Sequence, residues 1–197
     1  MKLILATRNP HKVDEIRQIL AGLDVELLSF IEYPDVPDVV EDGATLEENA
    51  VKKARTVADA TGLPALADDT GLEVDALGGK PGVRSARYGG EPPDYQRNNE
   101  KLLRELAGVP RGSRRARFRC VVALAVPGGD VRTVEGRTEG VILEAGRGSD
   151  GFGYDPLFLP DGHDATYAEM SASAKNAVSH RGRAVRAARG LVEAILG

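Results

Sequence analysis

Over residues 1–70, short apolar segments alternate with amphipathic segments of helical period. Residues 2–6 and 25–28 are each predicted to form a short buried strand, and a helix with an apolar stripe is predicted between them. A second helix is predicted over residues 45–61, and it leads into a third strand at 65–67. Strands and helices in this alternating order predict an α/β fold in which some strands pair in parallel.

The remainder of the chain carries signals of antiparallel pairing. Two valine-rich segments flank the turn sequence Pro127-Gly128-Gly129-Asp130, which predicts a β-hairpin and therefore a mixed sheet. The later elements are expected as a helix over 94–106, hairpin strands over 116–126 and 131–143, and a closing helix over 183–196. Because no repeat or low-complexity segment interrupts the sequence, we expect one domain over residues 1–197.

The length and composition exclude several classes of protein. A chain of 197 residues with 42% hydrophobic content buries enough surface to fold without a disulfide or a structural metal. Cys120 is the single cysteine, so an intrachain disulfide and a cysteine zinc site are excluded. No apolar run approaches the roughly 20 residues of a membrane span, and the apolar start is too short for a signal peptide. We therefore expect a soluble, cytoplasmic protein without a membrane partner.

The charge distribution argues against binding of long nucleic acids. The formal net charge is −4, whereas nucleic-acid-binding domains are usually basic. Residues 1–75 contain 16 acidic and 7 basic side chains, and residues 76–197 contain 14 acidic and 19 basic ones. The acidic part offers ligands for a metal ion, and basic side chains from both parts can contact a small polyanion.

The first candidate site is the segment Thr7-Arg8-Asn9-Pro10-His11-Lys12, which joins the first strand to the first helix. Loops at the carboxyl ends of strands are the usual ligand sites of α/β sheets, and a helix N-terminus with nearby cations suits phosphate. The chain contains no Gly-Lys-Ser or Gly-Lys-Thr sequence, so this is not a Walker loop. Phosphate binding and simple capping of the helix by Thr7 or Asn9 both explain these residues.

Two adjacent carboxylates, Asp68 and Asp69, directly follow the third strand and precede Thr70. Neighbouring carboxylates at a strand end are expected to repel each other, and a hard cation such as Mg²⁺ would relieve that repulsion. Glu41, in an acidic loop over residues 32–43, is a candidate for a further ligand. An Asx turn that ends the strand is the alternative. The pattern favours metal binding or acid–base chemistry.

Lys53 is predicted to face the core. At about 100° per residue it projects with the apolar stripe that contains Leu46, Ala50 and Val57. A buried ammonium group requires an anionic partner, because burying it unpaired is costly. A lysine whose stem lies along the edge of the core while its charge reaches solvent explains the position equally well.

Two segments in the second half are candidates for contacts with a ligand. Phe152 lies between two glycines, which leaves one face of its ring open to a flat group such as a purine. A core phenylalanine in a glycine turn is the alternative. A helical projection through residues 175–182 places Arg181 on the apolar side, and we expect Arg181 and His180 to point toward a pocket.

Taken together, these segments resemble the inosine triphosphate pyrophosphatase family, whose members hydrolyse nonstandard purine nucleoside triphosphates. The resemblance covers nearly the whole chain, in six blocks at residues 5–9, 48–50, 66–72, 81–88, 151–156 and 179–182. The family pattern Thr-x-Asn-x-x-Lys is met by Thr7, Asn9 and Lys12. Arg8 and His11 stand where the family commonly has glycine.

The resemblance implies a fold and a reaction. The fold would be α/β, with an elongated mixed β-sheet and flanking helices that form two lobes around a central nucleotide cleft. The protein would be a homodimer that requires Mg²⁺. The reaction would convert ITP, dITP or XTP and water into the nucleoside monophosphate and pyrophosphate.

The resemblance also implies roles for residues at the matching positions. Glu41 and Asp69 would hold Mg²⁺, and Asp69 would act as general base for water, assisted by Asp68. Lys53, the third catalytic residue, would contact the triphosphate. Arg181 would line the base and sugar pocket. By the chemistry of the bases, a cationic donor such as Arg181 aimed at the O6 atom of hypoxanthine or xanthine would disfavour adenine. The implied substrate-binding residues are Thr7, Arg8, Asn9, Pro10, His11, Lys12, Thr70, Phe152, Gly153, Tyr154, Asp155, Lys175, His180 and Arg181.

Two other functions remain open at this point. One is a related pyrophosphatase that acts on modified pyrimidine or methylated nucleotides, and the other is a noncatalytic nucleotide-binding or RNA-contacting module. The pair Asp68-Asp69 favours catalysis, because a protein that only binds phosphate gains nothing from two anions nearby. No serine lies in a nucleophile-elbow pattern, so a Ser-His-Asp triad is not expected. Cys120 is expected in the core and His163 in a surface loop.

Overall fold

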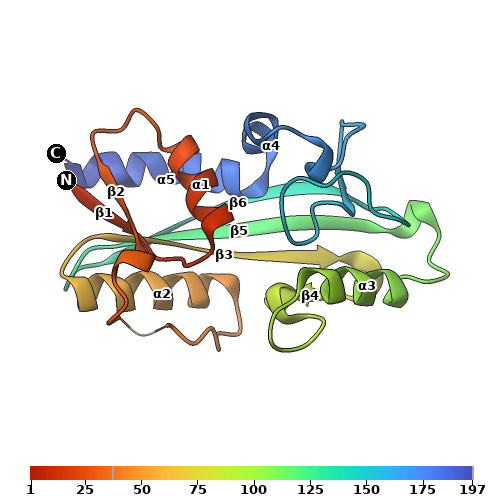
Figure 1. The fold of residues 1–197 in the computed structure, drawn as a ribbon, viewed down its shortest axis with the longest axis horizontal. Coiled ribbons are helices and arrows are strands. Elements are labelled where there is room, and N and C mark those ends of the chain that lie inside the picture. The colour runs from red at the N-terminus through yellow and green to blue at the C-terminus, as the bar shows by residue number, and fades with distance from the viewer. Residues whose placement is uncertain (37, 197) are drawn as a thin grey trace. The chain divides into compact units, whose positions relative to one another are not determined.

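The computed structural model describes residues 1–36 and 38–196, without the side chain of Leu196 (Figure 1). Its helices are α1 (Pro10–Ile19), α2 (Leu46–Thr61), α3 (Tyr95–Glu105), α4 (Ala172–Val178) and α5 (His180–Leu196). Its strands are β1 (Lys2–Leu5), β2 (Glu26–Ser29), β3 (Ala65–Val74), β4 (Pro81–Gly82), β5 (Arg115–Ala125), β6 (Val131–Ile142) and β7 (Phe158–Pro160). Within the described residues, no helix combines the length and apolar content needed to cross a bilayer.

A single seven-stranded sheet has the order β2-β1-β3-β5-β6-β7, with β4 paired to β3. β1 pairs in parallel with both of its neighbours, so that Leu5 lies opposite Ser29 of β2 and Leu66 of β3. The pairs β3–β4 and β6–β7 are antiparallel. These parallel and antiparallel pairs confirm the mixed α/β fold predicted from the sequence.

The chain divides into two compact units. The first consists of residues 1–69, 120–136 and 181–197, and the second of residues 70–119 and 137–180. Strands β3, β5 and β6 each contribute residues to both units. The paired aspartates, Lys53 and Arg181 therefore belong to the first unit, whereas the loop around Phe152 belongs to the second.

In the first unit, α1 and α5 pack against one face of the strands. Val13 and Ile16 of α1 form a buried cluster with Leu3 and Leu5 of β1 and with Val185 of α5. α2 lies on the other side of these strands (Figure 1). The first unit thus presents two different helical layers to the two faces of β3.

Local capping explains where the helices of the first unit begin. The Asn9 side chain accepts a hydrogen bond from the His11 amide and Pro10 occupies the first turn of α1, where its missing N–H costs nothing. Thr45 caps α2 through the Glu48 amide at 3.1 Å. α2 ends at Gly62, whose φ of 68° is the left-handed conformation that favours glycine at a helix end.

Aromatic side chains form much of the core of the second unit. Phe118 of β5 packs on Phe158 of β7 with ring centroids 4.8 Å apart, and on Tyr167 at 6.0 Å. Leu102 of α3 and Tyr154 join the same cluster. These rings hold α3 and the loop that precedes β7 within one core.

The structure differs from the predicted elements at the end of β3, at the start of α5, and in short elements that were not predicted. β3 continues to Val74 instead of stopping at residue 67, because Leu72 and Val74 extend the buried apolar pattern. α5 begins at His180 rather than 183, since Gly182 lies inside the helix without breaking it. The short helix α4 and the two-residue strand β4 were not predicted, because neither is long enough to produce a periodic pattern.

Candidate active site

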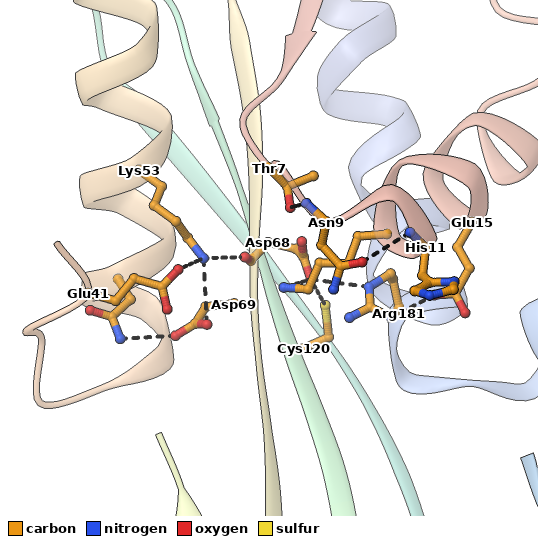
Figure 2. Close-up of polar contacts among 12 residues, drawn as sticks. Thr7, Asn9, His11, Glu15, Glu41, Lys53, Asp68, Asp69, Cys120 and Arg181 are labelled. Atoms are coloured by element: carbon orange, nitrogen blue, oxygen red, sulfur yellow. Dashed lines mark hydrogen bonds and ion pairs between the residues drawn. The ribbon is translucent and has the colours of Figure 1, made fainter. Parts of the chain in front are cut away.

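Asp68 and Asp69 lie inside β3 rather than beyond its end. Adjacent side chains in a strand point to opposite faces of the sheet. Figure 2 shows the two carboxylates on different sides of the strand, with Asp68 toward Arg181 and Asp69 toward Lys53. The expectation of two carboxylates repelling each other at a strand end is therefore wrong, and so is the Asx turn. The pleat of the strand assigns them to two separate clusters.

The first cluster surrounds Asp68 and contains two cations. Lys12 Nζ lies 3.0 Å and Arg181 Nε 3.1 Å from the same oxygen, Asp68 Oδ2. Arg181 also donates through Nη1 to Glu15 Oε2 at 2.6 Å. The Cys120 thiol lies 3.9 Å from Asp68 Oδ2. This Asp68 cluster is supplied by α1, β3, β5 and α5, all within the first unit.

Electrostatics keep Asp68 ionised. Burial alone would raise the pKa of Asp68, but Lys12, Arg181 and Lys53 outweigh burial and hold the pKa far below its usual value. Burial by itself would lower the pKa of the Arg181 guanidinium. The carboxylates of Asp68 and Glu15 raise this pKa by more, so the net change is an increase. A carboxylate held in this way is a poor proton acceptor. Asp68 therefore holds Lys12 and Arg181 in place rather than exchanging protons.

The second cluster surrounds Asp69 and contains Lys53, Glu41 and Asn49. Lys53 Nζ lies 2.7 Å from Glu41 Oε1 and 3.6 Å from Asp69 Oδ1, and it donates to the Asp68 carbonyl oxygen at 2.7 Å. Asn49 donates through Nδ2 to Asp69 Oδ2 at 3.0 Å. The inward orientation predicted for Lys53 is confirmed, and its ammonium group contacts two carboxylates and a backbone carbonyl oxygen (Figure 2). We call this group the Asp69 cluster.

The pKa of Asp69 shifts in the opposite direction from that of Asp68. Burial raises the pKa of Asp69, and Lys53 only partly opposes this while Glu41 adds to it. Burial lowers the pKa of Lys53, but Asp69, Glu41 and Asp68 outweigh burial, so its pKa is raised and the ammonium form persists. Neighbouring carboxylates with opposite shifts are typical of sites that give the two groups different roles. Asp69 is the better proton acceptor of the two.

The Glu41–Asp69 pair fits a divalent cation that prefers oxygen ligands. Both carboxylates already contact one positive charge, the ammonium of Lys53. Mg²⁺ in proteins is commonly held by one or two carboxylates together with substrate phosphates. In the part of the chain that the structure describes, no group of three or more His, Cys, Asp or Glu side chains could hold a metal. Mg²⁺ at this pair would therefore take its remaining ligands from phosphate and water.

The segment Thr7–Lys12 turns directly into α1. Thr7 Oγ1 accepts a hydrogen bond from the Asn9 amide at 3.2 Å, and Asn9 Oδ1 accepts one from the His11 amide at 3.0 Å. His11 itself is exposed. The capping role considered for this segment is thus confirmed for Asn9. The phosphate-binding role of the segment stays a prediction.

Arg8 points toward the acidic loop that leads to Glu41. Its Nε atom lies 2.5 Å from Asp38 Oδ1, and Nη2 donates to the Val36 carbonyl oxygen at 3.0 Å. The guanidinium also lies over the Phe30 ring, 4.4 Å from its centroid. In this chain the arginine thus joins the Thr7–Lys12 segment to residues that follow β2.

In the second unit, Phe152, Asp155 and Lys175 form a third cluster. Asp155 Oδ2 accepts hydrogen bonds from the Phe152 amide at 2.8 Å and from Lys175 Nζ at 2.6 Å. Lys175 Nζ lies 4.7 Å from the centroid of the Phe152 ring, and Tyr95 makes a tilted ring contact with Phe152 at 6.1 Å. Lys175 and Asp155 are both buried. The loop around Phe152 is therefore held from inside by one carboxylate.

Three further predicted residues, Thr70, Tyr154 and His180, belong to the second unit. Tyr154 is buried and donates to the Ser85 carbonyl oxygen at 2.8 Å. His180 is buried and stacks on Phe118 with ring centroids 4.4 Å apart. Thr70 is half-buried in β3. Their predicted contacts with a nucleotide stay predictions.

A pocket of about 400 Å³ adjoins the Phe152 loop within the second unit. Tyr95 and Leu103 of α3 line one part of it, and Phe152 and Leu157 line another. Asn99 also lines it and donates through Nδ2 to the Gly153 carbonyl oxygen at 2.9 Å. Its mixture of aromatic, aliphatic and amide side chains suits a flat ring with polar edges.

Replacing Gly151 by alanine should destabilise the Phe152 loop. Gly151 has a φ of +73°, and a Cβ atom there would lie 2.2 Å from Asp155 Oδ2. The expected loss of unfolding free energy is about 1–3 kcal/mol from backbone strain, with a further loss because Asp155 must move. Urea unfolding monitored by circular dichroism measures this loss.

Gly153→Ala is the matched control for Gly151→Ala. Gly153 has a φ of +65°, but a Cβ atom there meets no atom within 4 Å. The control therefore carries the backbone strain without the clash. Equal losses of unfolding free energy in the two variants would contradict the inferred packing of Gly151 against Asp155.

Two residues of the clusters were not among the predicted site residues. Asn49 projects about 40° from Lys53 on α2, so a second polar side chain on the buried face was the signal for it. Glu15 lies one turn after Lys12 on α1, and its partner Arg181 is distant in sequence. No local pattern could have identified Glu15, because its role depends on a contact between the two ends of the chain.

Known proteins resemble this chain in sequence over nearly its whole length. The dITP/XTP pyrophosphatase of Geobacter sulfurreducens is 58% identical over 184 residues, which cover 93% of this chain and 92% of the relative. The dITP/XTP pyrophosphatase of Streptomyces avermitilis is 50% identical over 198 residues, covering 100% and 99% of the two chains. The alignment with the Streptomyces avermitilis relative includes every segment that forms the three clusters.

Solved structures show the same fold. The Staphylococcus aureus Ham1 protein matches with a TM-score of 0.87 and 36% identity, over 99% of this chain and 100% of that one. A HAM1 protein from Coxiella burnetii matches with a TM-score of 0.89 and 39% identity, over 98% of each chain. The sequence profile of the Ham1 family matches residues 3–191. The predicted resemblance is thereby confirmed, and the chain belongs to the Ham1 family.

Proposed function

We propose that this protein hydrolyses nonstandard purine nucleoside triphosphates, dITP, XTP and ITP among them, to the monophosphate and pyrophosphate. Membership of the Ham1 family and the similarity to dITP/XTP pyrophosphatases support this activity. The observation that carries the mechanism is the Asp69 cluster, in which a carboxylate with a raised pKa lies beside an ammonium group. A nucleotide-binding module without chemistry would not need that arrangement.

In the proposed reaction, Asp69 accepts a proton from the attacking water. The water oxygen forms a bond to the α-phosphorus while the bond from that phosphorus to the α–β bridging oxygen breaks. Pyrophosphate leaves with the bonding electron pair, and the water proton passes to Asp69. A base near its own pKa is most effective in such a transfer, and burial moves Asp69 in that direction.

The positive side chains of the first unit would stabilise the phosphates. Lys53 remains an ammonium group because its carboxylate neighbours raise its pKa. Lys12 is held at the start of α1 by Asp68, next to a helix N-terminus that favours anions. Phosphoryl transfer depends mainly on positioning and charge stabilisation of this kind.

Glu41 and Asp69 would hold Mg²⁺, whose chemistry is to neutralise charge on the phosphate oxygens. The contact of both carboxylates with the Lys53 ammonium supports this assignment. Activity should therefore require added Mg²⁺ and be lost when a chelator removes it.

The Phe152 cluster would recognise the base. A ring stacked on Phe152 is expected to contribute about 1–3 kcal/mol. Lys175 and Asp155 are buried beside that ring and offer a donor and an acceptor to the edge of a base. Arg181 donates to Asp68 and Glu15, and its contact with the O6 atom of the base is proposed on the family resemblance. On the family resemblance, we also propose that the protein is cytoplasmic and that it forms a homodimer. Size-exclusion chromatography would test whether the dimer forms.

The test is a panel of nucleoside triphosphates assayed with Mg²⁺ for both pyrophosphate and orthophosphate. We expect kcat/KM for dITP, XTP and ITP to exceed that for ATP by about 100-fold or more. A site that hydrogen-bonds one edge of a base strongly rejects a base whose edge carries the wrong donors and acceptors. Water labelled with ¹⁸O should place its oxygen in the monophosphate. Similar turnover of ATP, GTP and ITP would contradict the substrate class, and release of orthophosphate would contradict cleavage at the α-phosphorus. Preference for modified pyrimidine nucleotides would favour the related pyrophosphatase instead.

A further inference from the structure

We propose that Asn49 is a positioning residue, which fixes the position of Asp69 relative to the backbone next to Glu41. Asn49 thereby sets the affinity of this carboxylate pair for a divalent cation. The inference rests on the proposed function, because it concerns the same pair of carboxylates. It assigns to Asn49 a role that the sequence did not indicate.

Both ends of the Asn49 amide are engaged. Nδ2 donates to Asp69 Oδ2 at 3.0 Å, and Oδ1 accepts a hydrogen bond from the Gly43 amide at 2.8 Å. The side chain is 1% exposed. Only this orientation of the amide places the donor against the carboxylate and the acceptor against the N–H group. The amide therefore has one stable orientation, and it ties Asp69 to the loop.

The loop is built for a close approach to Asn49. A Cβ atom at Gly43 would lie 2.7 Å from Asn49 Oδ1 and 2.9 Å from the Cβ atom of Glu48. The φ of Gly43 is not in the left-handed region, so backbone conformation does not require glycine here. The close contact with Asn49 does. The neighbouring Ala44 amide donates to Glu48 Oε2 at 2.7 Å. Residues 43 and 44 are thus hydrogen-bonded to side chains near the start of α2. Gly43 itself lies two residues after Glu41 in the chain.

α2 contacts both oxygens of Asp69. Asn49 binds Oδ2, and Lys53, one turn later on the same face, lies 3.6 Å from Oδ1. Lys53 also contacts Glu41 Oε1 at 2.7 Å. The helix therefore determines the rotation of the Asp69 carboxylate and, through Gly43, the position of the segment that carries Glu41.

Mg²⁺ requires near-octahedral geometry, so small displacements of its ligands weaken binding. Groups that orient metal ligands typically change metal affinity by about 10- to 100-fold when they are removed. If Asn49 only satisfied buried polar groups, its loss would lower stability without a specific effect on metal binding. The experiment must separate these two roles.

The second unit contains a matched control, Asn98 of α3. It is also 1% exposed, accepts a hydrogen bond from the Gly89 amide at 2.5 Å, and donates to the Ala86 carbonyl oxygen at 2.9 Å. A Cβ atom at Gly89 would lie 2.8 Å from the Arg97 carbonyl carbon. Asn98 thus repeats the glycine–asparagine arrangement with a carbonyl in place of the Asp69 carboxylate.

The test measures Mn²⁺ binding to the full-length, metal-free protein by electron paramagnetic resonance, together with the Tm of each variant. Asn49→Ala should bind Mn²⁺ about 10- to 100-fold more weakly than the parent. Asn98→Ala should lower Tm to a similar extent and leave the Mn²⁺ Kd unchanged. In dITP hydrolysis, the Mg²⁺ concentration for half-maximal rate should rise by the same factor for Asn49→Ala only.

A second pair of variants keeps the test valid if Asn49→Ala does not fold. In Gly43→Ala, the added Cβ atom should displace the Asn49 side chain and so weaken Mn²⁺ binding. Gly89→Ala should leave Mn²⁺ binding unchanged. Equal Mn²⁺ Kd values in parent, Asn49→Ala and Gly43→Ala would overturn the inference while leaving the proposed activity intact. Absence of nucleotide hydrolysis by the parent would instead overturn the proposed function.

Discussion

Replacing Asp69 by asparagine should lower kcat for dITP by about 1,000-fold or more. The variant loses the proposed general base, whose removal typically costs about 10²–10⁴ in rate, and one proposed Mg²⁺ ligand as well. Its shape is almost unchanged, and the new side chain can still accept the hydrogen bond from Asn49 Nδ2 that Asp69 Oδ2 accepts at 3.0 Å. The measurement is the rate of pyrophosphate release at saturating dITP and Mg²⁺.

The control for Asp69→Asn is its thermal unfolding and far-ultraviolet circular dichroism. We expect a folded protein with a Tm close to that of the parent, so that the lost rate cannot be assigned to unfolding. A kcat within tenfold of the parent value would show that Asp69 is not the base, even if the nucleotide preference is as proposed.

Replacing Asp68 by asparagine should have its main effect on stability. The substitution removes the anion that faces Lys12 at 3.0 Å and Arg181 at 3.1 Å, and leaves Glu15 as the carboxylate in contact with Arg181. Removing one partner of a buried ion pair typically costs about 3–5 kcal/mol, because the remaining charge stays buried. Urea unfolding at neutral pH in the absence of metal measures the loss of free energy.

Asp38→Asn is the matched control for Asp68→Asn. Asp38 also pairs with an arginine, Arg8, but its side chain is 79% exposed. Exposed pairs of this kind contribute about 0–1 kcal/mol, so the control should unfold almost like the parent. A similar loss in both variants would contradict the assignment of Asp68 as the buried centre of its cluster.

The effect of Asp68→Asn should also depend on pH. The pKa of Asp68 is lowered in the folded protein, so its ionised form stabilises the fold above the pKa of an unfolded aspartate, about 3.9. That stabilisation is lost as the pH falls below this value toward the lowered folded pKa. The difference between parent and Asp68→Asn should therefore be largest near neutrality and shrink below about pH 4.

Local patterns were sufficient for most of the fold. The alternation of strands and helices over residues 1–70 predicted that some strands pair in parallel, and in the structure β1 pairs in this way with both of its neighbours. The turn at residues 127–130 predicted the hairpin of β5 and β6. These features depend on residues close together in the chain, where periodicity and turn chemistry act directly. The short elements α4 and β4 are too brief to produce such a signal.

The end of β3 could not be predicted in the same way. Two ionisable residues in succession normally indicate that a buried strand has ended, because burying a charge is costly unless it is paired. The pairing groups here are Lys12 and Arg181 for Asp68, and Lys53 for Asp69. They come from three separate helices, and no local rule places them beside one strand.

The residues alone were thus enough to indicate the mixed α/β class, the Ham1-type blocks and the inward face of Lys53, because periodicity and motif spacing are local properties of a chain. The folded arrangement was needed to separate Asp68 from Asp69, since the pleat of β3 sends each carboxylate to a different helical layer. Burial and the charges of partners distant in sequence then shift their pKa values in opposite directions. That separation distinguishes a carboxylate that holds cations in place from one suited to accept a proton.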